Sequence, residues 1–183
     1  MEELIHDFLL AALFGSDYKK VDDCNLAINR AYRDFCRTIR KEPGGINARM
    51  NLKDSKTKAT NIILEFLKKD KSNYDEWHED LCKKLVDLRY TYGQAQKWVN
   101  MTMKYLYILG YKFNDKTIEK LHVPIDSKII EKAQDIVRKD IMDKIASWSS
   151  IDNYKIYWKF QDNLRTNLKP DTPFFWELKV WNE

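Results

Sequence analysis

Lys97 and Asp126 are the two residues whose types and surroundings most readily suggest chemistry in this chain. Lys97 stands near the start of the apolar stretch "QKWVNMTMKYLYILG", residues 96–110, and Asp126 follows a proline in "LHVPIDSK", residues 121–128. Apolar or aromatic side chains cover nearly every face of the first stretch, which predicts an enclosed central helix. A charged residue in such a helix needs a structural or a chemical reason.

Two interpretations of Lys97 are open on the sequence alone. In the structural one, Lys97 lies at the exposed start of the helix and Lys104 extends its amine to the surface. In the chemical one, the helix dipole and partial burial both disfavour an ammonium in the first turn, leaving a neutral amine that can form a Schiff base. Asp126 would then direct its carboxylate at the same cleft. An Asp two residues after a helix-starting proline is, however, also an ordinary first-turn residue.

The order of these residues resembles the helix-hairpin-helix DNA glycosylases, in particular the archaeal 8-oxoguanine glycosylases. The resemblance rests on a Gln-Lys pair that opens a helix, a loop, and "P-[IV]-D" entering the next helix, and it covers about residues 92–136. It implies a glycosylase-like core in which Lys97 attacks the sugar C1′ of a flipped nucleotide and Asp126 supports that attack. By the same resemblance, Gln96 and Asn100 position these two residues.

The chain departs from that family at the hairpin before the lysine helix. The family carries a glycine-rich "LPGVG" turn there, and such a turn presents backbone amides to a DNA phosphate. This sequence has "RYTYGQAQ" at residues 89–96, with the single glycine Gly93, and no iron–sulfur cysteine cluster follows. The departure favours a non-catalytic helical protein over a standard glycosylase.

Basic residues concentrate between residues 37 and 71, where ten Lys or Arg stand against four Asp or Glu, in a chain of formal net charge +4. The glycines and polar residues in this region predict a basic loop at about residues 42–55. As a functional surface it would contact the phosphate backbone of a nucleic acid, duplex DNA in preference to RNA, through four side chains: Arg49, Lys53, Lys56 and Lys58. The alternative is a solvated surface whose lysines supply solubility.

The composition and the periodicity predict an all-α fold. The chain has only five glycines and four prolines in 183 residues, and apolar residues recur at helical spacing along most of its length. We expect a single compact domain, residues 1–183, of roughly eight or nine helices. The aromatic segment 148–183 would pack on the core of this domain, with base stacking on exposed rings as the alternative.

Neither a metal site nor a cofactor is predicted. The three cysteines have no CxxC spacing and the three histidines form no ligand motif, so we expect reduced thiols in a cytoplasmic protein. The N-terminal run "FLLAALFG" is too short to span a bilayer and follows acidic rather than basic residues. We therefore predict a buried first helix and no membrane partner. The sequence carries no indication of an oligomeric state.

Two functional hypotheses follow. The first is a nucleic-acid-binding protein that acts as a DNA N-glycosylase and AP lyase on a flipped damaged base, through a Schiff base on Lys97. The second is a non-catalytic helical interaction protein that binds a protein partner. The first requires the amine of Lys97 and the carboxylate of Asp126 to face one cleft within several ångströms.

Overall fold

The structure is all-α throughout the part that it describes. The computed structural model describes residues 1–16, 18–39 and 45–182, and for residues 37–39 and 45–53 only the path of the backbone. These ranges hold no strand, and they contain two short 3-10 helices, η1 (Tyr18–Lys20) and η2 (Trp148–Ser150). Their ten α-helices are α1 (Glu2–Phe14), α2 (Asp23–Ile39), α3 (Gly45–Leu67), α4 (Tyr74–Val86), α5 (Tyr92–Ile108), α6 (Asp115–Lys120), α7 (Ser127–Lys132), α8 (Lys139–Met142), α9 (Tyr154–Asn167) and α10 (Pro173–Trp181).

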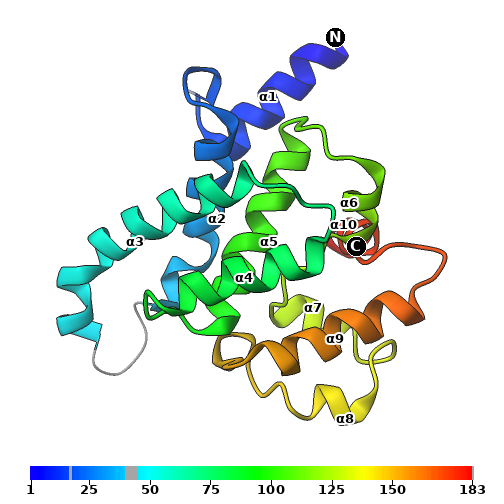
Figure 1. The fold of residues 1–183 in the computed structure, drawn as a ribbon. Helices are drawn as coiled ribbons and strands as arrows, with labels where there is room; N and C mark the ends of the chain where they lie inside the picture. The colour runs from blue at the N-terminus through cyan, green and yellow to red at the C-terminus, as the bar shows by residue number, and fades with distance from the viewer. Residues whose placement is uncertain (17, 40–44, 183) are drawn as a thin grey trace.

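Helix α5 is the centre of the fold (Figure 1). It packs most extensively against α2 and α4, and within residues 92–106 every side chain except that of Lys97 is buried. The fully buried Trp98 packs its ring on Phe35 of α2 and donates from Nε1 to the carbonyl oxygen of Ile28 at 3.0 Å. The prediction of an enclosed central helix is confirmed, and its physical reason is apolarity on all faces.

Helix α5 begins earlier than the sequence suggested, at Tyr92 rather than after Gly93. Thr91 caps it in a reciprocal arrangement with Gln94, so the "TYGQ" segment is a capping box. Gly93 lies inside the first turn of α5. A residue with a side chain would not fit at this position, because its Cβ would stand 1.9 Å from the backbone oxygen of Trp148 in η2. The glycine therefore allows the close approach of η2 to α5.

Two further expectations about the elements are wrong. The predicted basic loop at residues 42–55 is helical from Gly45 onward, since no glycine or proline interrupts the chain between that residue and the end of α3; residues 42–44 lie outside the described part. The helix count is ten rather than eight or nine in the described residues, because the chain between α5 and α9 breaks into the short helices α6, α7 and α8.

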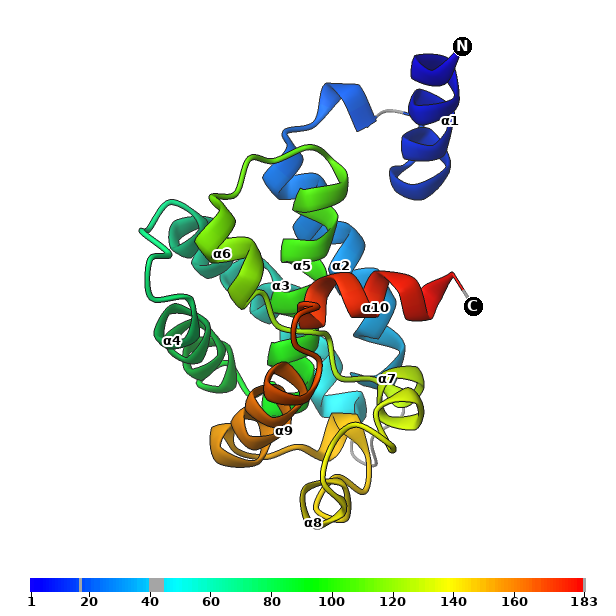
Figure 2. The same ribbon diagram turned by 90° about the vertical axis from the view of Figure 1, so that its right-hand side faces the viewer.

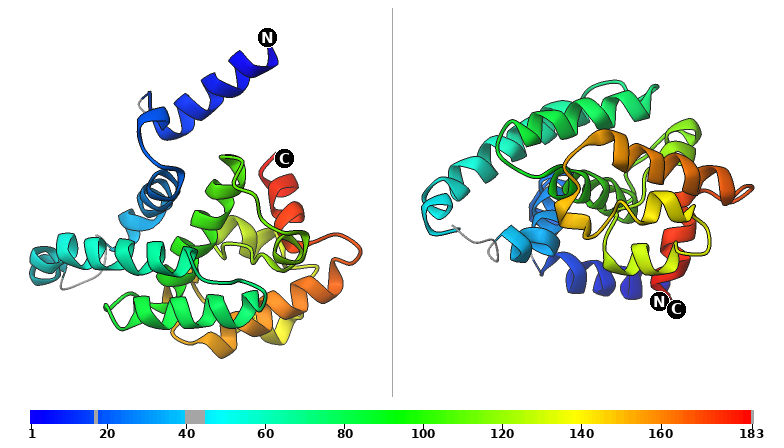
Figure 3. Two further views of the ribbon diagram at one scale, coloured as in Figure 1. Left: turned by 45° about the horizontal axis from the view of Figure 1, so that its top comes forward. Right: turned by 90° about the horizontal axis from the view of Figure 1, so that it is seen from below.

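The first helix is not the buried element that its sequence predicted. Only Leu10 and Phe14 of α1 are buried, and the helix extends away from the rest of the fold (Figures 2 and 3). Its large exposed side chains are Met1, Leu4, Ile5, Phe8 and Leu9. No helix among the described residues is both long enough and apolar enough to cross a membrane.

The C-terminal aromatic segment packs mainly on the core. Trp148, Tyr157, Phe160 and Phe174 are buried, whereas Trp181 at the end of α10 is 49% exposed. Helix α10 lies near α7 (Figure 2). This places Trp181 at the surface beside the site described next.

Candidate functional site

Lys97 and Asp126 meet although 29 residues separate them in the sequence. Lys97 Nζ lies 3.2 Å from Asp126 Oδ2, and the two side chains are only 11% and 10% exposed. Both face one pocket of about 340 Å³ between α2, α5, α7 and α10. Its lining residues are Arg30, Asp34, Lys97, Met101, Lys104, Tyr105, Asp126 and Trp181.

Asp126 holds its carboxylate in place through the start of α7. It is the N-cap of that helix rather than a first-turn residue, and Oδ1 accepts a hydrogen bond from the backbone N–H of Ile129 at 3.0 Å. Oδ1 therefore caps the N-terminus of α7, and Oδ2 faces Lys97. The helix after Pro124 begins later than expected because residues 121–126 run extended and buried before the cap.

Lys97 owes its environment to neighbouring side chains more than to the helix terminus. Because α5 starts at Tyr92, Lys97 lies in its second turn, beyond the first turn in which the helix dipole acts strongly. Its amine lies 4.5 Å from the ring centroid of Trp148, on which a lysine ammonium is stabilised. Carboxylate and indole together hold the amine at the pocket.

Lys104, about two helical turns after Lys97 on α5, lines the same pocket. It does not extend to the surface, as the structural interpretation expected, but is 9% exposed and pairs with Glu177 at 2.6 Å. Glu177 is fully buried, and this burial raises the pKa of its carboxyl although Lys104 opposes the effect. The ring of Trp181 lies beside the amines of Lys104 and Lys128, at 5.5 and 4.7 Å from its centroid.

The opposite wall of the pocket is a linked set of side chains from α2 and α5. Arg30 pairs with Asp34 one turn later, and the hydroxyl of Tyr105 donates to the other oxygen of Asp34. Burial first, and Asp34 second, raise the pKa of Tyr105 well above its ordinary value. The hydroxyl is therefore protonated at neutral pH and serves as a hydrogen-bond donor.

Gln96 and Asn100 do not line the pocket but hold the segment that leads to Asp126. Gln96 accepts from the backbone N–H of Ile125 at 3.1 Å and donates to its carbonyl at 2.9 Å. Asn100 donates to the carbonyl of Val123 at 3.0 Å. These contacts are compatible with the positioning role that the resemblance implies.

The predicted basic contacts are not gathered at this pocket. The side chains of Arg49 and Lys53 lie outside the described part of the structure. Lys56 donates to Asn29 at 2.9 Å, so its amine is engaged within the protein, and burial lowers its pKa. Lys58 is exposed on α3 and does not line the pocket.

The first turn of α5 uses two of its backbone amides internally. The N–H of Gly93 donates to the carbonyl of Ile151 at 2.8 Å, and the N–H of Gln94 donates to the side chain of Thr91 at 3.1 Å. Neither amide is open to a phosphate. Nucleic acid at this site would need other contacts than a glycine-rich hairpin supplies.

A larger pocket of about 550 Å³ lies elsewhere, between the start of α2 and the end of α3, with three lysines on its wall. Lys71 donates to the carbonyls of Leu67 and Lys69, and the amine of Lys69 lies over the ring of Phe66. These amines are engaged within the protein, so the smaller pocket is the stronger candidate. No group of three or more potential metal ligands occurs among the described side chains.

Sequence reasoning missed Arg30, Asp34, Lys104, Glu177 and Trp181 as parts of one site. A signal existed only for Lys104, which stands seven residues after Lys97 and therefore on the same helical face. Comparisons of the chain with protein-family models, curated proteins and solved structures give no significant match.

Proposed function

We propose that this protein is a DNA N-glycosylase and AP lyase that acts through a Schiff base on Lys97. The observation that carries the proposal is the placement of Lys97 Nζ 3.2 Å from Asp126 Oδ2 at a common pocket. A lysine nucleophile needs a group that removes its ammonium proton, and the Asp126 carboxylate lies within hydrogen-bonding distance of Lys97. The pair also occupies the two positions that the resemblance to helix-hairpin-helix glycosylases implies.

The chemistry needs both members of the pair. Lys97 must attack as the free amine, and Asp126 Oδ2 is close enough to accept the ammonium proton. As the bond from Nζ to the sugar C1′ forms, the bond from C1′ to the base breaks, and the base leaves with the electron pair and takes a proton from Asp126. Asp126 then takes a proton from Nζ and passes it to the ring oxygen O4′ as the C1′–O4′ bond breaks, which opens the sugar and gives the Schiff base. The Schiff base makes C2′ acidic, and transfer of a C2′ proton to Asp126 expels the 3′ phosphate and cuts the strand.

The pocket suits a single flipped base. Its volume of about 340 Å³ is at the small end of the range for ligand sites, roughly 300–1,000 Å³. The half-exposed ring of Trp181 offers a stacking face. Lys104 gives one of its three N–H hydrogens to Glu177 and can offer another to the edge of a base, and the oxygen of Tyr105, whose hydrogen is directed to Asp34, can act as an acceptor.

Borohydride trapping on duplex DNA with an abasic site or a damaged base tests the proposal. We expect a covalent adduct with the wild type, none with Lys97→Ala, and a normal yield with Lys139→Ala, which removes an exposed lysine outside the pocket. Absence of an adduct with the wild type, or equal trapping by Lys97→Ala, refutes the lyase proposal. Salt-dependent binding to an arbitrary duplex tests nucleic-acid binding separately.

A second candidate function is that of a non-catalytic interaction protein. The observation that favours it is the exposed apolar side of α1, where Leu4, Phe8 and Leu9 are 74%, 70% and 57% exposed. Exposed apolar patches of this kind mark protein contacts. If α1 carries the function, Phe8→Glu abolishes association with a partner or a second copy in light scattering, and Lys97→Ala does not.

A further inference from the structure

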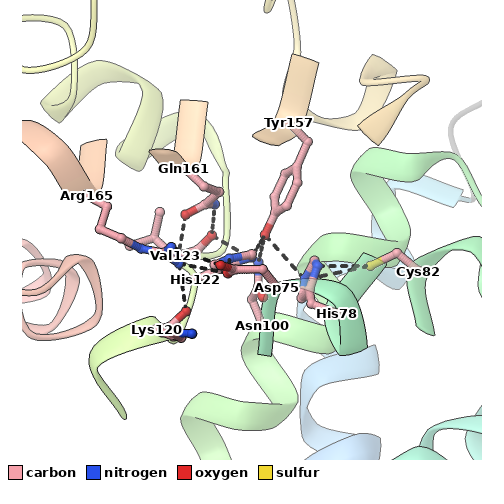
Figure 4. A network of polar contacts seen from close by, with 10 residues as sticks. All are labelled: Asp75, His78, Cys82, Asn100, Lys120, His122, Val123, Tyr157, Gln161 and Arg165. Atoms are coloured by element: carbon pink, nitrogen blue, oxygen red, sulfur yellow. Dashed lines mark hydrogen bonds and ion pairs between the residues drawn. The ribbon is translucent and has the colours of Figure 1, made fainter. Parts of the chain in front are cut away.

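Behind the pocket lies a buried chain of polar side chains that joins α4, α5 and α9 (Figure 4). Its members lie far apart in the sequence, and the histidines among them share no motif. Three of its members, His78, His122 and Tyr157, are at most 2% exposed. The side chains drawn in Figure 4 are Asp75, His78, Cys82, Asn100, Lys120, His122, Val123, Tyr157, Gln161 and Arg165.

The hydrogen bonds of this network converge on Asp75, which accepts from both Arg165 and His122. Arg165 holds Asp75 with contacts of 3.0 and 3.2 Å, and Asp75 Oδ1 lies 2.8 Å from His122 Nε2. Burial raises the pKa of Asp75, but the bonds from His122 and Arg165 outweigh it and keep the pKa well below the ordinary value. Because the carboxylate can only accept, His122 Nε2 carries a proton.

The donors and acceptors of the hydrogen bonds between His122, Tyr157 and Asn100 follow in the same way. Burial lowers the pKa of His122, so its ring is neutral and Nδ1 is an acceptor. The hydroxyl of Tyr157 therefore donates to Nδ1, at 2.7 Å. The oxygen of Tyr157 is left to accept from Asn100 Nδ2 at 3.0 Å.

The hydrogen bonds of these side chains lead to the extended segment 121–126, which carries Asp126. Asn100 Nδ2 also lies 3.0 Å from the carbonyl of Val123, and Gln161 pairs with both backbone groups of that residue, at 2.8 and 3.2 Å. Arg165 donates to the carbonyl of Lys120 at 3.0 Å. With the contacts of Gln96 to Ile125, the extended segment 121–126 is bonded at alternate residues, as a strand is by its neighbour.

We propose that Tyr157, His122 and Asp75 are positioning residues that set the distance between Asp126 and Lys97. The proposal rests on the function proposed above, since it concerns the same reaction. An apolar core would bury this segment equally well but would not fix its register. A buried polar network favours the arrangement that pairs most of its groups, because each unpaired group costs free energy. Among the described side chains, Asn100 Oδ1 and Arg165 Nε are the two atoms of this network that are buried without a hydrogen-bond partner.

The test is Tyr157→Phe, with Tyr154→Phe as the matched control one turn earlier on α9. The substitution keeps the ring, which stacks on His78, and removes only the hydroxyl between His122 and Asn100. We expect the single-turnover rate of adduct formation to fall about 10- to 100-fold, as for misplacement of a reacting group by about 1 Å. The dissociation constant for the same duplex should stay within about twofold, and the control should keep the wild-type rate.

Hydrogen exchange gives a reading that does not depend on activity. In Tyr157→Phe the amides of Val123 and Ile125 should exchange faster than in the wild type, whereas the amides in the middle of α5 stay protected. Gln161→Met, which releases Val123 directly, should give the same pattern. If the wild type forms no adduct, the proposed function fails. Hydrogen exchange at Val123 and Ile125 still reports whether the buried polar side chains hold the segment 121–126 in place.

Three results would overturn the inference. Tyr157→Phe could keep both the wild-type rate and wild-type exchange at Val123 and Ile125. Its rate could fall only in proportion to lost stability, together with that of Tyr154→Phe. Unfolding of both Tyr157→Phe and Gln161→Met would also count against it. The buried polar side chains would then stabilise the whole fold and not the segment 121–126 in particular.

Discussion

Asp126→Asn separates the two roles that Asp126 has in the structure. The asparagine keeps an oxygen that can accept from the N–H of Ile129 and therefore keeps the cap of α7. It removes the negative charge 3.2 Å from Lys97 Nζ. Asp126→Ala removes both contacts, so the difference between the two variants isolates the cap.

The magnitudes follow from burial and geometry. Loss of the carboxylate leaves the Lys97 ammonium beside a neutral amide, but the amine borders an open pocket where water replaces part of the lost contact. We therefore expect Asp126→Asn to destabilise by about 1–2 kcal/mol, well below the ~3–5 kcal/mol for breaking a fully buried pair. Asp126→Ala should cost about 1 kcal/mol more, the usual value of an N-cap.

Activity should follow a different pattern from stability. In the proposed reaction Asp126 accepts the Lys97 proton and both variants remove this group, so both should lower the rate of adduct formation by about 10²- to 10⁴-fold. Urea unfolding and single-turnover trapping on the same samples measure the two effects. Wild-type trapping by Asp126→Asn, with reduced trapping only in Asp126→Ala, would refute the chemical role and leave Asp126 as a helix cap.

Three further perturbations test the surroundings of the site. Gly93→Ala should lower the free energy of unfolding by about 3 kcal/mol, because the new Cβ meets a backbone oxygen of η2 at 1.9 Å. Glu177→Leu should cost about 3 kcal/mol or more by leaving the Lys104 amine unpaired, and Lys104→Met in the same chain should restore most of it, as urea unfolding can measure. Burial lowers the pKa of both His78 and His122. As the pH falls below about 6.5, these two histidines therefore take up protons in the unfolded chain but not in the folded one. The free energy of unfolding should then drop by up to about 2.7 kcal/mol per pH unit below pH ~6.5.

Each of these has a result that contradicts it. Gly93→Ala with unchanged stability would mean that η2 does not approach α5 as closely as described. A double variant at Lys104 and Glu177 no more stable than Glu177→Leu would show that the pair is not the cause. A free energy of unfolding that is flat between pH 7.5 and 5.5 would mean that the two histidines titrate alike in the folded and unfolded chains.

The sequence predicted what depends on local pattern. The enclosure of α5 follows from apolar residues on all its faces, whereas the proximity of Lys97 and Asp126, 29 residues apart, is implied by the resemblance and by no local pattern. The start of α5 at Tyr92 lies before the position that the sequence predicts, because the role of Gly93 is set by η2, more than fifty residues later. The partner of Lys104 stands 73 residues away on α10, and no spacing in the sequence connects the two.

The failures on α1 and α3 have a different cause. In α1 an apolar run was interpreted as burial, but burial depends on what packs against a helix, and the described part of the fold covers only Leu10 and Phe14. In the segment 42–55 the glycines were interpreted as a loop, yet helix propensity beyond Gly45 outweighs them. Composition alone cannot decide either question, because tertiary packing overrides a weak local preference.

The adjacency of Gln96 and Lys97 has a geometric explanation in α5. Neighbours on a helix point about 100° apart, so the helix presents two stripes of side chains. Gln96 and Asn100, four residues apart, bind the segment that ends at Asp126. Lys97, Met101 and Lys104 line the pocket from the other stripe. One helix thus holds the amine and also anchors the segment that carries the carboxylate, so α5 sets the distance between the two groups.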